Sequence, residues 1–177
     1  NAFSYAPITQ IVIPGNVQYI GYGVFAYCKQ LNKVSIGKGV KYIGDAAFGG
    51  TPWLEAQTDD FVIVGDGILV KYLGGSRQKI VIPDGVKEIC GNAFFELMDM
   101  NPKFTFNGVE YIKLPKSIER IEDFALNDGD EKTKIYFEDE DIHFGFSAIG
   151  QYCTIIAPKG SSAEKYAIDN KISYQEK

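Results

Sequence analysis

The sequence predicts a repeat solenoid of the α/β class, with short parallel strands on one face of the array and return segments of helix-like spacing. Three observations support this prediction. Short apolar segments that look alike recur along the chain, and their spacing fits a unit of about 23 residues. Other positions recur at fixed distances from these segments. The composition, with 45% hydrophobic and 23% charged residues among 177, is ordinary for a folded protein and excludes general disorder.

Each repeat opens with a segment that reads as a short strand. The segments are Ile11-Val-Ile13, Val34-Ser-Ile36, Ile80-Val-Ile82, Ile112-Lys-Leu114 and Ile135-Tyr-Phe137. Their starts are 23, 46, 32 and 23 residues apart, so the array has a 23-residue unit, one gap of a full unit and one nine-residue insertion. The outer two residues of each segment are apolar, as in a strand with one buried face. A proline follows three of the segments and ends the strand, because it cannot donate to a ladder.

Three further positions recur in all five units when the first strand residue is counted as zero. Offset nine is apolar, with Ile20, Ile43, Ile89, Ile121 and Phe144. Offset thirteen is small, with Val24, Ala47, Ala93, Ala125 and Ala148. Offset fourteen is large, with Phe25, Phe48, Phe94, Leu126 and Ile149. We expect the small residue where neighbouring coils approach closely and the large one in the core. One coil cannot bury its own apolar face, so the coils must stack.

Two of the units carry a resemblance to a known family. The stretches IVIPGNVQYIGYGVF, from Ile11 to Phe25, and IVIPDGVKEICGNAF, from Ile80 to Phe94, resemble the BspA-type bacterial leucine-rich repeat. The resemblance covers nearly the whole chain. It implies a leucine-rich-repeat solenoid with a parallel sheet on one face, and a bacterial cell-surface or secreted protein that serves in adhesion and host-protein binding. The family has no common catalytic residues to carry over.

The two ends of the chain differ. Residues 1–177 are predicted to form a single leucine-rich-repeat domain of about six coils. Asn1-Ala-Phe3 matches Asn92-Ala-Phe94, so the chain is expected to begin inside a repeat, as a fragment of a longer array. Residues 154–177 are expected to close it with a strand from Thr154 and a capping helix over 161–170. Ser161 and Glu164 have the spacing of a capping box.

Two stretches do not fit the regular unit. The doubled spacing contains Phe61-Val-Ile-Val-Gly-Asp-Gly-Ile-Leu-Val-Lys-Tyr72, which reads either as a hairpin around Gly65-Asp66-Gly67 or as a degenerate coil. The nine-residue insertion lies near Met98 to Gly108 and is expected to form a protruding loop.

Charge and composition exclude several classes of protein. The net charge of −5 argues against nucleic acid as a partner. No apolar run approaches the ~18 residues of a membrane span, so no membrane insertion is expected. Three cysteines about 62 residues apart match neither a zinc site nor a disulfide framework, so Cys28, Cys90 and Cys153 are expected to be buried and unbridged.

No residue pattern predicts chemistry. The acidic segments 128–131 and 138–141 lack the spaced ligands of a calcium loop and read as solvated edges. The single histidine, His143, makes a histidine-rich metal site impossible. Trp53 is expected to pack in the core or a loop rather than to serve as a sugar platform. We therefore expect no catalytic, cofactor or metal residues and a protein that is not an enzyme.

The remaining feature is the exposed face of the sheet. Residues that flank the inward strand positions point outward, and six of them are lysine or tyrosine: Lys33, Lys79, Tyr111, Lys113, Lys134 and Tyr136. We predict a non-enzymatic adhesion module that binds a protein ligand, such as a host surface or matrix protein, through this face, with glycans as a further ligand class. Alternatives are a structural spacer that presents another domain and a carbohydrate-binding surface. The lysines also have a simpler explanation, since they keep strands soluble.

Overall fold

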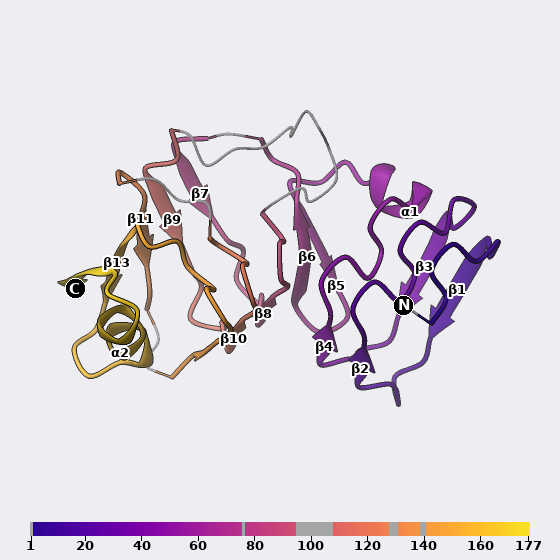
Figure 1. The fold of residues 1–177 in the computed structure, drawn as a ribbon. Helices are drawn as coiled ribbons and strands as arrows, with labels where there is room; N and C mark the ends of the chain where they lie inside the picture. The colour runs from indigo at the N-terminus through magenta and orange to yellow at the C-terminus, as the bar shows by residue number, and fades with distance from the viewer. Residues whose placement is uncertain (1, 76, 95–107, 128–130, 139–140) are drawn as a thin grey trace.

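The computed structural model describes residues 2–75, 77–94, 108–127, 131–138 and 141–177. The chain winds into a solenoid of about six coils, and its two termini lie at opposite ends of the array (Figure 1). The predicted solenoid is confirmed. The expected loop near Met98 to Gly108 lies outside the described residues, apart from Gly108 itself, as do residues 128–130 and 139–140 of the acidic segments.

The predicted strands, together with one more strand at the C-terminus, form one line of parallel strands, which we call the front sheet. Its five-stranded part contains β7 (Lys79–Val81), β9 (Tyr111–Lys113), β11 (Lys134–Tyr136), β13 (Thr154–Ala157) and β14 (Ser173–Glu176). β1 (Gln10–Ile13) and β3 (Lys33–Ile36) form a separate parallel pair. Ile112 pairs with Ile80 on one side and with Ile135 on the other, and Ile135 pairs with Ile155. The predicted register is therefore confirmed.

A second line of strands, the return sheet, runs along the opposite side of the coils. It contains the two-residue strands β2 (Tyr19–Ile20), β4 (Tyr42–Ile43), β8 (Glu88–Ile89), β10 (Arg120–Ile121) and β12 (His143–Phe144). The second residue of each strand is the apolar residue at offset nine. Figure 1 shows β8 and β10 on the side of the molecule opposite β7 and β9.

The helix-like spacing of the return segments does not produce helices. Turns follow each short strand, and offset twelve is left-handed in every unit: Gly23, Ala46, Asn92, Phe124 and Ser147 have φ between 46° and 57°. A left-handed L-residue costs ~1–2 kcal/mol and interrupts a right-handed helix. The expectation that the return segments, at offsets nine to fourteen, are helix-like is therefore wrong for the regular coils. The two described helices are α1 (Pro52–Glu55), capped by Thr51, and α2 (Ser162–Asp169).

The doubled spacing contains a hairpin. β5 (Phe61–Val64) is antiparallel to β6 (Ile68–Tyr72), and the connecting glycines Gly65 and Gly67 have φ of 60° and 92°. β6 also pairs in parallel with β8, so the hairpin occupies the place of a coil in the return sheet. It contributes no strand to the front sheet, which is interrupted between β3 and β7.

The C-terminal helix is present where the sequence places it. Ser161 Oγ accepts a hydrogen bond from Glu164 N at 3.2 Å, as the capping box requires. The Glu164 carboxylate differs from the expectation, because it accepts from Gly160 N instead of Ser161 N. Ala163 and Ala167 are buried beneath the helix. In the described part of the chain, no helix has the length and apolarity needed to cross a bilayer.

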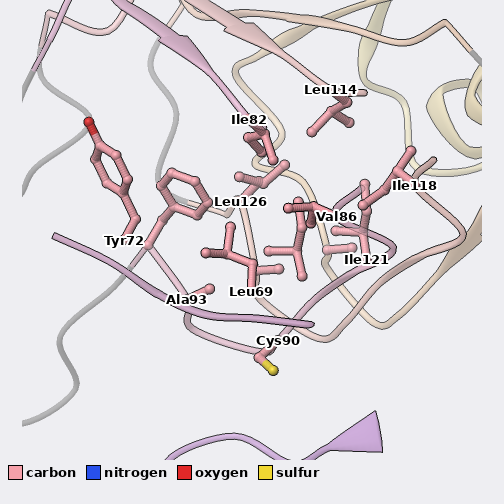
Figure 2. Packing of buried hydrophobic residues seen from close by; sticks show 14 of the residues in the cluster. Leu69, Tyr72, Ile82, Val86, Cys90, Ala93, Leu114, Ile118, Ile121 and Leu126 are labelled. Carbon is pink, nitrogen blue, oxygen red and sulfur yellow. The ribbon is translucent and has the colours of Figure 1, made fainter. Parts of the chain in front are cut away.

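The core lies between the front and return sheets. Figure 2 shows buried side chains from both sides converging, among them Leu114 and Ile82 from the front and Leu69 and Ile121 from the return side. At offset thirteen, Ala47, Ala93, Ala125 and Ala148 are all at most 2% exposed, as expected for points of close coil contact. The cysteines Cys28, Cys90 and Cys153 are buried and reduced.

Candidate functional site

The parallel register sorts the outward residues of the front sheet into two rows, which together we call the front face. The first row runs from β7 through β9 to β11 and contains Lys79, Tyr111 and Lys134. The second row contains Val81, Lys113 and Tyr136. Neighbouring strands lie ~4.8 Å apart. Five of the six candidate binding residues therefore lie on three adjacent strands.

Lys33 does not belong to this cluster. It lies on β3, where it pairs with Gln10 of β1 in the separate two-stranded sheet. The hairpin that follows supplies no front strand between β3 and β7. The lysine repeats the offset of Lys79 in sequence, but an interruption of the sheet separates the two.

Tyr111 and Tyr136 form an aromatic pair at the centre of the front face. They are diagonal neighbours, because Tyr111 stands opposite Lys134 and Tyr136 opposite Lys113. Their ring centroids are 4.5 Å apart with an interplanar angle of 38°. Such a pair contributes about 0.5–1.5 kcal/mol beyond its buried area. Both side chains are half-buried, so the contact orders the rings and leaves part of each accessible.

Lys113 is held by an acidic partner that the sequence did not reveal. Its Nζ lies 2.8 Å from Oε1 of Glu138, in a segment interpreted as a solvated acidic edge. This hydrogen-bonded ion pair raises the pKa of Lys113 and lowers the pKa of Glu138. Lys79 and Lys134 are exposed, and the ion pairs found among the described residues do not include them. The positive charge available to a partner therefore comes mainly from the first row.

An open groove adjoins the second row, at the ends of β7 and β9. Its volume is about 570 Å³, within the usual range for ligand sites. Polar groups and apolar side chains share its lining: Val81, Ile82, Asp84, Gly85, Lys113, Leu114, Pro115, Lys116, Ser117 and Glu138. Val81 is 57% exposed, so an apolar side chain stands in solvent beside the ion pair. The front face thus combines two aromatic rings, free lysines and an adjoining groove.

Other groups with potential chemistry lie elsewhere. Among the described residues, no three His, Cys, Asp or Glu side chains are grouped so as to hold a metal ion. Burial raises the pKa of the Cys90 thiol well above its ordinary value, which disfavours the nucleophilic thiolate. Trp53 packs edge-on against Phe48, with ring centroids 5.0 Å apart. The expectation that Trp53 serves in packing is confirmed.

Comparison with known proteins gives one family and one related structure. The family model described as BspA type leucine rich repeat region matches residues 1–61 and 72–153, in six copies. No curated protein matches. A solved structure, the crystal structure of the pneumococcal vaccine antigen PcpA, is 18% identical, with a TM-score of 0.38, and the match covers 90% of this chain and 53% of the other. The chain therefore spans about half the length of that protein.

Proposed function

Because the chain belongs to the BspA-type leucine-rich repeat family, we propose that it is a non-enzymatic binding module of a bacterial cell-surface or secreted protein. Its ligand is an acidic protein, such as a host surface or matrix protein, that docks on the front face. The observation that carries this proposal is the Tyr111–Tyr136 pair next to the exposed lysines Lys79 and Lys134, on a chain whose net charge is −5.

The side chains of the front face suit protein recognition. Tyrosine is common at interface hot spots, because a rigid ring covers a large area and loses little conformational freedom. Exposed lysines attract an acidic partner, and they affect association rate and specificity more than final affinity. Solubility alone explains lysines on a sheet face. It does not explain the two tyrosines or the exposed Val81, which support binding.

A carbohydrate ligand is the second candidate function. The specific observation that favours it is the groove of about 570 Å³ at the ends of β7 and β9, lined by Asp84, Ser117 and Glu138 among others. Carboxylate oxygens and a hydroxyl group can hydrogen-bond to sugar hydroxyl groups. A saccharide would depend on the groove carboxylates and be insensitive to salt. An acidic protein would depend on Lys79 and Lys134 and weaken as salt screens their charges.

The test uses arrays of immobilised extracellular-matrix proteins, plasma proteins and glycans, probed with the folded chain. For any protein bound, the double variant Tyr111→Ala/Tyr136→Ala should lose about 30-fold in affinity, equivalent to ~2 kcal/mol. The matched control is Tyr19→Ala/Tyr22→Ala, since these tyrosines are 67% and 61% exposed outside the front face. Full affinity in the first variant and loss in the second would place the site elsewhere. Binding to glycans alone would favour the second function.

A further inference from the structure

The solenoid is interrupted on both sides at the same place. In the front sheet, β3 ends the first pair and β7 begins the five-stranded part. In the return sheet, β2 and β4 form one pair, and β6, β8, β10 and β12 belong to another sheet. We call this interruption between β4 and β6 the joint. It divides the array into an N-terminal part, residues 2–56, and a C-terminal part from residue 61 onward.

A side chain replaces the strand ladder across the joint. On β4, Tyr42 N donates to Gln18 O and Gly44 N to Ile20 O, so the intervening Ile43 N–H points away from β2. In an intact parallel stack a backbone carbonyl of the next coil would accept from it. At the joint the acceptor is instead Glu88 Oε1 of β8, at 3.3 Å. Glu88 is only 4% exposed, which is rare for a carboxyl group.

A second side-chain bridge lies nearby. Asn92 Nδ2, after β8, donates to Asp45 Oδ2, after β4, at 2.6 Å. Both polar bridges therefore join the C-terminal part to the N-terminal part through a carboxyl group. Burial raises the pKa of Asp45, although the bond from Asn92 and the backbone bond from Ala46 favour its charged form.

Glu88 faces one like charge and one opposite charge, Glu122 and Arg120 of β10. The titratable groups Tyr42 of β4 and Cys90 also lie near it. Arg120 Nε lies 3.6 Å from Glu122 Oε1, so the positive charge of Arg120 acts on Glu122 as well as on Glu88. Burial is the largest cause that raises the pKa of Glu88, to about 7, and the Glu122 charge adds to it. Burial also raises the pKa of Glu122.

We propose that the joint is a pH-sensitive hinge, in which protonated Glu88 keeps the two parts of the array docked and ionised Glu88 weakens their docking. Protonated Glu88 still accepts from Ile43 N–H through its carbonyl oxygen and adds no charge beside Glu122. Ionised Glu88 places an unpaired charge in a buried site, and opening returns it to water. The hinge lies between β3 and β7, so it sets the position of Lys33 relative to Lys79, whatever the front face binds.

The direction of the pH dependence follows from the linkage between proton binding at Glu88 and docking of the two parts. An exposed glutamate titrates near its ordinary pKa of 4.5, and docked Glu88 titrates near 7. The docked state binds more protons between these values, so docking weakens as pH rises from about 4.5 to about 7 and stays weak above that range. These two values give a roughly tenfold increase in the ratio of open to docked molecules between pH 6 and pH 8.

Amide hydrogen exchange measured by NMR tests the hinge. Between pH 6 and pH 8, after correction for intrinsic exchange, the protection factor of Ile43 N–H should fall about tenfold. The reference is Leu114 N–H, which donates to Tyr136 O at 3.0 Å inside the C-terminal part and should keep its protection. Equal protection of Ile43 at both pH values in the folded protein would overturn the proposal, as would an equal loss at Leu114.

The variant Glu88→Gln keeps a carbonyl oxygen that can accept from Ile43 N–H, but it has no carboxyl group that titrates. Its Ile43 protection should be independent of pH, whereas the control Glu119→Gln, at an exposed glutamate next to Arg120, should behave as the parent. A persisting tenfold change in Glu88→Gln would contradict the hinge. Because that variant could fail to fold, the carboxyl carbon shift of Glu88 is followed in the parent protein. Titration near 7 supports the proposal, and titration near 4.5 overturns it.

Discussion

Glycines at the corners of the coils show what single residues contribute to this fold. A Cβ atom on Gly39 would lie 1.6 Å from the carbonyl oxygen of Gly15 in the preceding coil, and one on Gly44 would lie 2.5 Å from Tyr22 N. Backbone therefore packs directly on backbone where the chain turns. Sequence pattern does not reveal these contacts, because the partners are 24 and 22 positions away and come into contact only once the coils are stacked.

Gly39→Ala should lower the free energy of unfolding by about 1–3 kcal/mol, the usual range for overpacking, because the backbone of Gly15 cannot move aside as a flexible side chain would. Urea denaturation followed by circular dichroism measures the change. The matched control is Gly21→Ala, since a Cβ there would meet nothing within 4 Å. Similar effects of the two substitutions would show that close coil contact does not select glycine at position 39.

At the scale of elements, sequence pattern predicts strands better than return segments. Alternation of apolar residues locates β1, β3, β7 and β9, because a half-buried strand imposes that pattern. A proline after β1, β7 and β9 adds a second signal for the end of the strand. The return segments have apolar spacing that suits a helix, and the left-handed residue that prevents one is often invisible. Gly23 and Asn92 are typical of that conformation, but Ala46 and Phe124 are not. No pattern predicts β14, because Ser173-Tyr-Gln-Glu176 has a single apolar residue.

Sequence pattern predicts the candidate site in part, as it does the fold. Offset counting brings Lys79, Tyr111 and Lys134 into one row, because parallel strands in register repeat the same offset. It fails for Lys33, since the hairpin occupies a coil position without a front strand. It also fails for the Lys113–Glu138 ion pair, because no local pattern tells which of several acidic residues turns toward a given strand.

Ser161→Ala should destabilise α2 by about 1 kcal/mol, because the Ser161 hydroxyl accepts the hydrogen bond of Glu164 N at the start of the helix. The measurement is the urea midpoint of the whole chain, together with amide exchange within Ser162–Asp169. Ser173→Ala is the control, since Ser173 is exposed on β14 and outside the helix. Equal stability of the two variants would show that the Ser161 cap does not stabilise α2.

At the scale of the whole molecule, most contacts join neighbouring coils, so the stability of the array is approximately a sum of terms for the coils and for the interfaces between neighbours. The Glu88 and Asn92 bridges in addition join the β8 coil to the β4 coil. A stack of aromatic rings runs through the N-terminal part, where the ring centroids of Phe3 and Phe25 are 5.7 Å apart and those of Phe25 and Phe48 are 5.5 Å apart. The joint interrupts the backbone ladder beyond this stack. Damage on one side of the joint should therefore remain partly confined to that side.

Phe48→Ala should destabilise the N-terminal part by ~3–5 kcal/mol, since Phe48 is 1% exposed and packs against Phe25 and Trp53. Amide exchange should show faster exchange at Ile43, whereas Leu114 beyond the joint should keep most of its protection. The outcome that contradicts this picture is uniform loss of protection along the chain, which would show that the array unfolds as one cooperative unit in spite of the joint.

The joint also has a mechanical consequence. The two termini lie at opposite ends of the solenoid, so a pull between them acts along the hydrogen bonds that connect successive coils (Figure 1). Tension in that direction separates a ladder strand by strand instead of shearing many bonds at once. The Glu88 and Asp45 bridges replace a ladder at the joint, so the chain should lengthen there at low force while each part keeps its own sheets. A tether built from this array would yield at a defined point near its middle.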